Sequence, residues 1–249
     1  MNYQLGLVSI SFRPLSVDEI MDLCEKNHLK YIEWGSDVHA PCDDAERLAH
    51  IVAEQERRGL VCSSYGTYFR VGINPVEEIY GYIAAAKALG TKIIRLWCCK
   101  GNYENYTAEE RERILSDAKA LAKIAEAEGV TLCMECHNNT YTNCLEGARE
   151  LMETVQSKHF GMYWQPNQFV SYETNLEYAK EIAPHVTQIH VFNWEGKNRY
   201  PLKEAVKTWQ SYLSCFEGDH ALLLEHVPNT LPEELSAEAE ALRQIVEGL

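Results

Sequence analysis

The chain has 249 residues and a formal net charge of −14, with 46% hydrophobic and 24% charged residues. The acidic balance argues against a nucleic-acid partner, because binding to phosphate backbones needs clustered lysine and arginine side chains. The composition is that of a globular protein, and no apolar run reaches the roughly 18 residues that a membrane span requires.

The first residues, MNYQLGLVSISFRP, contain no basic segment followed by a long apolar stretch. We therefore expect no signal peptide and a cytoplasmic location. The nine cysteines show no paired zinc-ribbon spacing, which favours free thiols in a reducing compartment.

Short apolar segments alternate with helical segments along the whole chain. The expected strands are residues 5–11, 31–34, 61–65, 92–97, 131–135, 160–164, 186–192 and 221–225. Each is short and almost continuously apolar, as parallel strands buried on both faces are.

The helical segments carry their own start and stop signals. Ser16 with Glu19 and Thr107 with Glu110 have the spacing of capping boxes. Glycines stand where the second, third and fourth helices should end, at Gly59, Gly90 and Gly129. The eighth helix is expected over residues 233–247.

This alternation predicts a single (β/α)8 TIM barrel over residues 1–249, close to the typical length of about 250. An open doubly wound sheet is the alternative. It would normally carry a glycine-rich turn after the first strand, and residues 9–14 contain no glycine.

In such a barrel the active site lies where the strands end. Four polar residues end successive strands: Glu135, Gln165, His190 and Glu225. Any one of them alone is more often a surface or structural group. Together, two carboxylates, an imidazole and an amide oxygen in one register favour a site for one divalent ion, either Mn2+, Mg2+, Co2+ or Zn2+.

Other residues near strand ends are candidates for substrate binding. His137 follows Glu135 on the same side of an extended chain, where it can contact substrate or only cap nearby backbone. Glu33 is expected to bind substrate hydroxyl groups. Aromatic candidates for the site walls, each equally compatible with the core, are Trp34, Tyr65, Trp97, Trp164 and Trp194. Loop cations that can receive a phosphate or carboxylate, or remain solvated, are Lys100, Lys197 and Arg199.

Four motifs carry a resemblance over essentially the whole chain: MECHNN at 134–139, YWQPN at 163–167, QIHV at 188–191 and LLEH at 223–226. The chain resembles the xylose-isomerase-like barrel superfamily, the sugar phosphate isomerase/epimerase group. The resemblance implies one divalent ion held by Glu135, Gln165, His190 and Glu225, with the two glutamates as the acid/base pair. Gln165 stands where most relatives have Asp, and residues 192–199 replace the usual Lys-Asp stretch.

The implied reaction is proton abstraction next to a carbonyl of a small sugar or sugar phosphate, through an enediolate, by an isomerase or epimerase. Two alternatives stay open: a dehydratase-type lyase acting on a cyclic polyol or keto acid, and a metal-free barrel that only binds a ligand. AP endonucleases of this fold have extra histidines at the third and fourth strand ends, and residues 64–67 and 96–99 contain none. The oligomeric state is left open, a homo-oligomer included.

Overall fold

The computed structural model describes residues 3–249, and residues 1 and 2 lie outside the described part of the chain. Eight parallel strands close into a barrel in the spatial order β1-β10-β7-β6-β5-β4-β3-β2. These strands are β1 (Tyr3–Val8), β2 (Tyr31–Gly35), β3 (Val61–Val71), β4 (Ile93–Cys98), β5 (Thr131–Glu135), β6 (Phe160–Trp164), β7 (Val186–Val191) and β10 (His220–Leu224). The predicted (β/α)8 barrel is confirmed.

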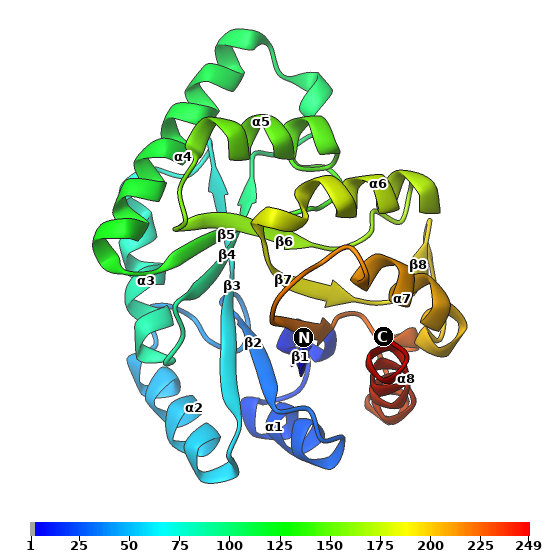
Figure 1. Ribbon diagram of the computed structural model, residues 1–249. Coiled ribbons are helices and arrows are strands. Elements are labelled where there is room, and N and C mark those ends of the chain that lie inside the picture. The colour runs from blue at the N-terminus through cyan, green and yellow to red at the C-terminus, as the bar shows by residue number, and fades with distance from the viewer. Residues whose placement is uncertain (1–2) are drawn as a thin grey trace.

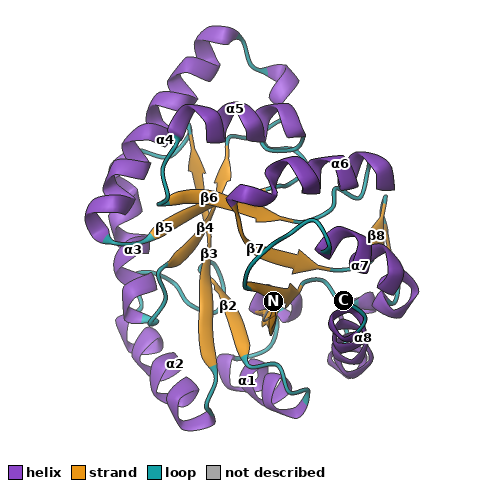
Figure 2. Ribbon diagram, viewed as in Figure 1, coloured by secondary structure: helices purple, strands orange, loops and turns teal. Residues whose placement is uncertain are grey.

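Helices surround the barrel, and Figures 1 and 2 show them outside the ring of strands. They are α1 (Val17–Lys26), α2 (Ala45–Arg58), α3 (Ile79–Ala88), α4 (Ala108–Glu128), α5 (Leu145–Val155), α6 (Tyr172–Ile182), α7 (Val206–Leu213) and α8 (Leu235–Glu247). A small antiparallel hairpin of β8 (Trp194–Glu195) and β9 (Asn198–Arg199) lies in the connection between β7 and α7.

The helix ends follow the sequence signals. Both predicted capping boxes form, at Ser16 with Glu19 and at Thr107 with Glu110. The three predicted stop glycines adopt positive φ angles: Gly59 at 68°, Gly90 at 82° and Gly129 at 69°. This conformation, which glycine adopts without a Cβ clash, lets the chain leave each helix and enter the next strand.

Some boundaries differ from those expected. The first strand stops at Val8, because the Ser9 and Ser11 hydroxyl groups take over hydrogen bonding to the neighbouring backbone in a short 3-10 helix. The third strand continues to Val71 past an irregularity in its register with β4. The last helix starts at Leu235, after a 3-10 turn over Pro232–Glu234.

Strand residues alternate between two environments. Outward-facing side chains pack against the helices in the main core, while a small apolar cluster that includes Val8, Cys133, Tyr163 and Leu223 fills the barrel interior. All nine cysteines are free thiols, and six of them are buried. Among residues 3–249, no helix has the length and apolar character to cross a bilayer.

One buried carboxyl group joins the last helix to the connection that follows β9. Glu238 on α8 is only 4% exposed, and its carboxylate oxygens accept hydrogen bonds from the Leu202 backbone N–H at 3.1 and 3.2 Å. Burial raises the pKa of Glu238 to about 7. The folded state therefore favours the protonated form of this side chain.

Replacing Glu238 with Gln should flatten the pH dependence of stability. Because the pKa of Glu238 is raised on folding, its contribution is full below about pH 4.5 and is lost as the pH rises through about 7. Urea unfolding at several pH values should show the wild type losing about 1–2 kcal/mol relative to Glu238→Gln over this range, less than the whole shift because solvent screens the group. Equal profiles for the two proteins would refute this, and the exposed Glu247→Gln change on the same helix is the control.

Candidate metal and acid/base site

The four predicted strand-end residues converge inside the mouth of the barrel. Glu135 ends β5 and His190 belongs to β7, while Gln165 and Glu225 directly follow β6 and β10. All four are buried, with exposures between 0% and 6%. Glu135, Gln165 and Glu225 each lie two residues beyond an inward-facing apolar side chain, and His190 lies two residues beyond Gln188, whose amide donates to the Ser63 carbonyl of β3. The alternation of the strands therefore turns all four inward.

His190 is the centre of the arrangement. Its Nδ1 atom lies 3.0 Å from Gln165 Oε1, 3.2 Å from Glu225 Oε2 and 3.4 Å from Glu135 Oε1. The other ring nitrogen, Nε2, lies 3.3 Å from Glu33 Oε2. One nitrogen thus faces three oxygens from three strands, and the opposite nitrogen is held by a fourth side chain.

Arg95 is a central residue that the sequence analysis missed. It lies on β4 with 1% exposure, and its guanidinium bridges two carboxylates. Its Nε lies 2.9 Å from Glu33 Oε1, and its Nη1 lies 2.5 Å from Glu135 Oε2. A signal was present in the sequence: Arg95 is two residues before Trp97, a candidate wall residue, and so shares its face of the strand.

Glu33 lies within the cluster. Its exposure is 0%, and its carboxylate accepts hydrogen bonds from Ser64 Oγ at 3.1 Å and from Arg95, and contacts His190. A carboxylate on the far nitrogen of a histidine fixes the orientation of the ring. In this structure Glu33 therefore holds His190 and Arg95, and its binding of substrate hydroxyl groups stays a prediction.

The buried charges stabilise one another. Burial by itself raises the pKa of Glu135, but the Arg95 guanidinium, together with His190 and His137, brings it down to about 2. Burial likewise raises the pKa of Glu225 and of Glu33, and the neighbouring cations more than reverse both shifts. Burial lowers the pKa of His190, yet Glu225, Glu33 and Glu135 together hold it well above the ordinary value.

The donor set fits a divalent cation. Ligand atoms of Glu135, His190 and Glu225 all lie within 4.8 Å of one another. Carboxylate oxygens and an imidazole nitrogen suit ions such as Mn2+, Mg2+, Co2+ and Zn2+, and the Gln165 amide oxygen adds a neutral fourth donor. Three carboxylates and one guanidinium in this cluster leave two negative charges when His190 is neutral, which is the charge a dication offsets.

The rim on the Glu135 side contains two of the predicted substrate contacts. The Trp97 and His137 rings stack with centroids 4.5 Å apart, and the Arg70 guanidinium carbon lies 4.1 Å from the Trp97 centroid. His137 and Arg70 therefore both cover the ring of Trp97 in this structure, where the sequence analysis expected a face open for stacking.

The rim on the Glu225 side has a similar composition. The Arg199 guanidinium carbon lies 4.7 Å from the Trp194 ring centroid, and its Nη1 donates to Thr230 Oγ1 at 3.2 Å. His226 packs edge-on against Trp194 and places its Nε2 atom 3.4 Å from Glu225 Oε1. Arg70 and His226 are further rim residues that the sequence analysis did not assign.

The remaining candidates lie away from this cluster. Trp164 faces outward, where its ring packs edge-on against Trp209 and Tyr212 of α7. Trp34 donates to Gln55 of α2, so it too belongs to the outer core. The other three are Tyr65, buried with its hydroxyl on the Ala40 carbonyl, and Lys100 and Lys197, both exposed in loops.

Removing the Arg95 charge should destabilise the folded protein. Arg95→Met leaves Glu33 and Glu135 buried without their shared cation, which is expected to lower the free energy of unfolding by about 3–5 kcal/mol. Urea unfolding in the presence of a chelator measures this loss. Adding Glu33→Gln to the same chain should restore part of it, because one unpaired charge is removed.

The control for this measurement is Arg57→Met. Arg57 pairs with Glu54 at 2.7 Å on the exposed face of α2, where solvent screens the ion pair and only a small loss of stability is expected. Equal losses in the free energy of unfolding for Arg95→Met and Arg57→Met would show that the buried ion pairs of Arg95 contribute no more to stability than the exposed pair of Arg57.

Comparisons with known proteins agree with the fold. The probable 3-DHS dehydratase AsbF of Bacillus anthracis superposes with a TM-score of 0.78 at 17% identity, covering 98% of this chain and 99% of that chain. The 3-keto-D-glucoside 4-epimerase YcjR of E. coli superposes with a TM-score of 0.72 at 13% identity, covering 99% of this chain and 100% of that chain. The IOLI protein with a binding zinc atom superposes with a TM-score of 0.72 at 18% identity, covering 99% of this chain and 96% of that chain.

These solved structures share the fold with this chain, and they include enzymes of the epimerase and dehydratase types. No curated protein matches the chain by sequence. A family model described as xylose isomerase-like TIM barrel matches residues 21–245. The chain therefore belongs to the xylose isomerase-like TIM barrel family.

Proposed function

We propose that this protein is a divalent-metal-dependent isomerase or epimerase that acts on a small sugar or sugar phosphate. The observation that carries the proposal is the convergence of Glu135, Gln165, Glu225 and His190 in one buried cluster at the strand ends. Burying several charged side chains together costs free energy through desolvation. Buried groups with strongly shifted pKa values gather at functional sites.

Glu135, Gln165, His190 and Glu225 would hold the metal ion. Glu33 supports this role by occupying His190 Nε2, which leaves Nδ1 directed at the oxygens of the other three. When bound, a dication supplies Lewis-acid stabilisation for the negative charge of an enediolate. The mixed donor set leaves the choice among Mn2+, Mg2+, Co2+ and Zn2+ to experiment.

The two glutamates differ in how freely they can accept a proton. One oxygen of Glu135 contacts Arg95, whose positive charge is permanent. Glu225 instead faces His190 and His226, whose charge, unlike that of an arginine, depends on protonation. We therefore assign proton abstraction next to the substrate carbonyl to Glu225, and proton return from the other side to Glu135.

A dehydratase-type lyase on a keto acid is the second candidate. Arg70 and Arg199 at the rim favour an anionic substrate, and either a phosphate or a carboxylate satisfies them. The same proton abstraction followed by expulsion of a β-hydroxyl group would give the lyase reaction. The neutral Gln165 is what favours the third candidate, a metal-free barrel that only binds its ligand.

Metal binding should stabilise the fold. The reference is protein freed of metal by a chelator. A cation at about 100 times its Kd adds about 2.7 kcal/mol to the free energy of unfolding, which raises Tm by roughly 5–10 °C for a chain of this size. Thermal unfolding with each of the four cations, alongside elemental analysis of the purified protein, measures this. Glu225→Gln should lose the shift, while Glu112→Gln on the exposed face of α4 should keep it. The absence of both metal and shift in the wild type would favour the metal-free barrel.

The reaction class can be read from exchange with heavy water. A panel of ketoses, ketose phosphates and hydroxylated keto acids is incubated with enzyme in D2O and followed by NMR. Deuterium should enter next to the carbonyl without loss of water, and Glu225→Gln should slow this entry at least about 100-fold. Elimination of water from any of these compounds would instead identify a lyase, and no exchange with any of them would count against both enzymes.

A further inference from the structure

Two adjacent cysteines at the end of β4 are not used by the proposed reaction. Cys98 is the last residue of the strand and is fully buried, and Cys99 follows it with 2% exposure. Cys99 has a φ of 58°, in the left-handed region that residues with a Cβ rarely adopt. Such strained positions persist only where the surrounding structure holds them, and they gather at functional sites.

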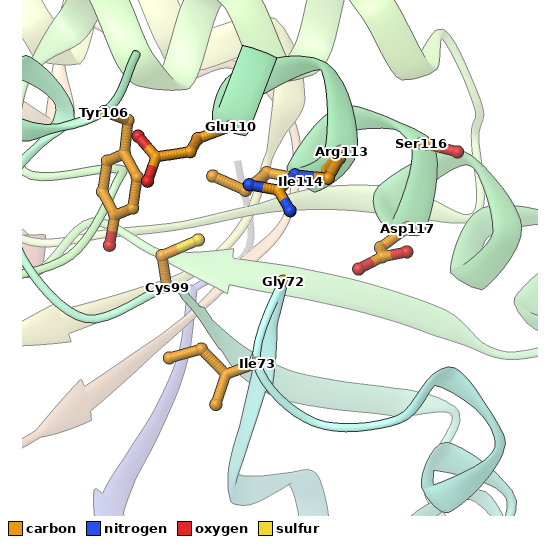
Figure 3. A pocket seen from close by; sticks show the side chains of 9 residues that line it. All are labelled: Gly72, Ile73, Cys99, Tyr106, Glu110, Arg113, Ile114, Ser116 and Asp117. Atoms are coloured by element: carbon orange, nitrogen blue, oxygen red, sulfur yellow. The ribbon is translucent and has the colours of Figure 1, made fainter. Parts of the chain in front are cut away.

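Cys99 lines a pocket outside the barrel mouth. The pocket has a volume of about 430 Å³ and lies between the turn after β3 and the first half of α4. Figure 3 shows the Cys99 side chain among Ile73, Tyr106 and Ile114, with Arg113 beside them. Cys99 thus borders a space large enough for a small molecule, while Cys98 is not among the residues that line it and is fully buried in the core.

The two thiols differ in character. Hydrogen bonding to Cys98 lowers the pKa of the Cys99 thiol, although burial opposes this change. Burial and the contact with Cys99 raise the pKa of the Cys98 thiol. The thiolate is the nucleophile in thiol chemistry, so Cys99 is the attacking group. Cys98, the adjacent residue, is placed to react with the oxidised form of Cys99.

We propose that Cys98 and Cys99 form a redox site at which a small hydroperoxide oxidises the pair to a disulfide between adjacent residues. The Cys99 thiolate attacks the terminal oxygen of the hydroperoxide, the O–O bond breaks, and an alcohol or water leaves after taking up a proton. The Cys98 sulfur then attacks the Cys99 sulfenic acid. The S–O bond breaks, and the hydroxyl group leaves as water with the Cys98 proton.

The Cys98–Cys99 disulfide would be easily reduced. Adjacent Cα atoms are about 3.8 Å apart, which is shorter than the roughly 4.4 Å minimum of ordinary disulfides. A strained disulfide has a more oxidising potential than a structural one, so small thiols reduce it readily. These properties suit a reversible response to peroxide rather than a permanent crosslink.

The pair is joined to the rim of the candidate site. Arg70 Nη1 donates to the Cys99 carbonyl at 2.6 Å, and the same guanidinium covers one face of Trp97. The Cys98 carbonyl accepts from the Tyr141 backbone N–H at 2.9 Å, in the loop after β5. The N–H of the same Cys98–Cys99 peptide donates to the Val71 carbonyl at 2.9 Å. Turning this peptide to close a disulfide therefore disturbs its contacts with Tyr141 and Val71, next to the carbonyl that Arg70 holds.

The test uses the folded full-length chain and measures no enzymatic activity, so its result is independent of the proposed function. The protein is treated with hydrogen peroxide, denatured, alkylated and digested with trypsin. Cleavage after Arg95 and Lys100 releases the peptide LWCCK, which contains both cysteines and no others. The expected product is LWCCK lighter by two hydrogens and without alkyl groups, restored to the doubly alkylated form by dithiothreitol before alkylation.

Cys62 provides an internal control, because it is the single cysteine of the tryptic peptide 59–70 and burial raises the pKa of its thiol. Oxidation of LWCCK should be at least about tenfold faster than that of the Cys62 peptide, and this preference should disappear in urea. Cys98→Ser should accumulate a sulfenic acid on Cys99 that dimedone traps, and Cys99→Ser should leave Cys98 unreacted. Recovery of doubly alkylated LWCCK while other cysteines oxidise, or a Cys99 sulfinic acid without disulfide in the wild type, would overturn the proposal.

Discussion

The buried guanidinium of Arg95 is the interaction on which the rest of the site depends. It neutralises the carboxylates of Glu33 and Glu135 at once, from β4, between the strands that carry them. Without it, two anions would lie in the barrel interior at a cost of several kcal/mol each. With it, Glu33 is free to hold His190, and Glu135 keeps one oxygen directed at the cluster.

The bridge adjoins an apolar cluster inside the barrel. Tyr163, Leu223 and their neighbours form this cluster, and Tyr163 packs edge-on against His190. A paired cation and indole lies at each side of the rim. The barrel thus supplies a rigid interior and leaves variation to the loops, which is how this fold accommodates many reactions.

Much of this arrangement was predictable from the order of residues. The barrel followed from eight alternating segments, and the cluster followed from polar residues that end successive strands. Arg95 was hidden because its partners lie 62 and 40 residues away, so nothing near it in the sequence shows that it is paired. Trp164 shows the opposite case, since alternation next to an inward Gln165 already implies that the tryptophan faces the helices. The covering of Trp97 by Arg70 and His137 depends on side-chain placement that spacing does not reveal.

The pairing of β1 with β10 has a consequence for how the protein is made. These strands meet across almost the whole chain, with Leu7 beside Leu224, so their contact must wait until the ribosome has delivered both. Until then the growing chain presents two unpaired strand edges, which are prone to pair with other molecules. Glu225 follows directly after the strand that closes the ring. During synthesis, closing the barrel is therefore also the step that completes the candidate cluster, and an unfinished chain has neither.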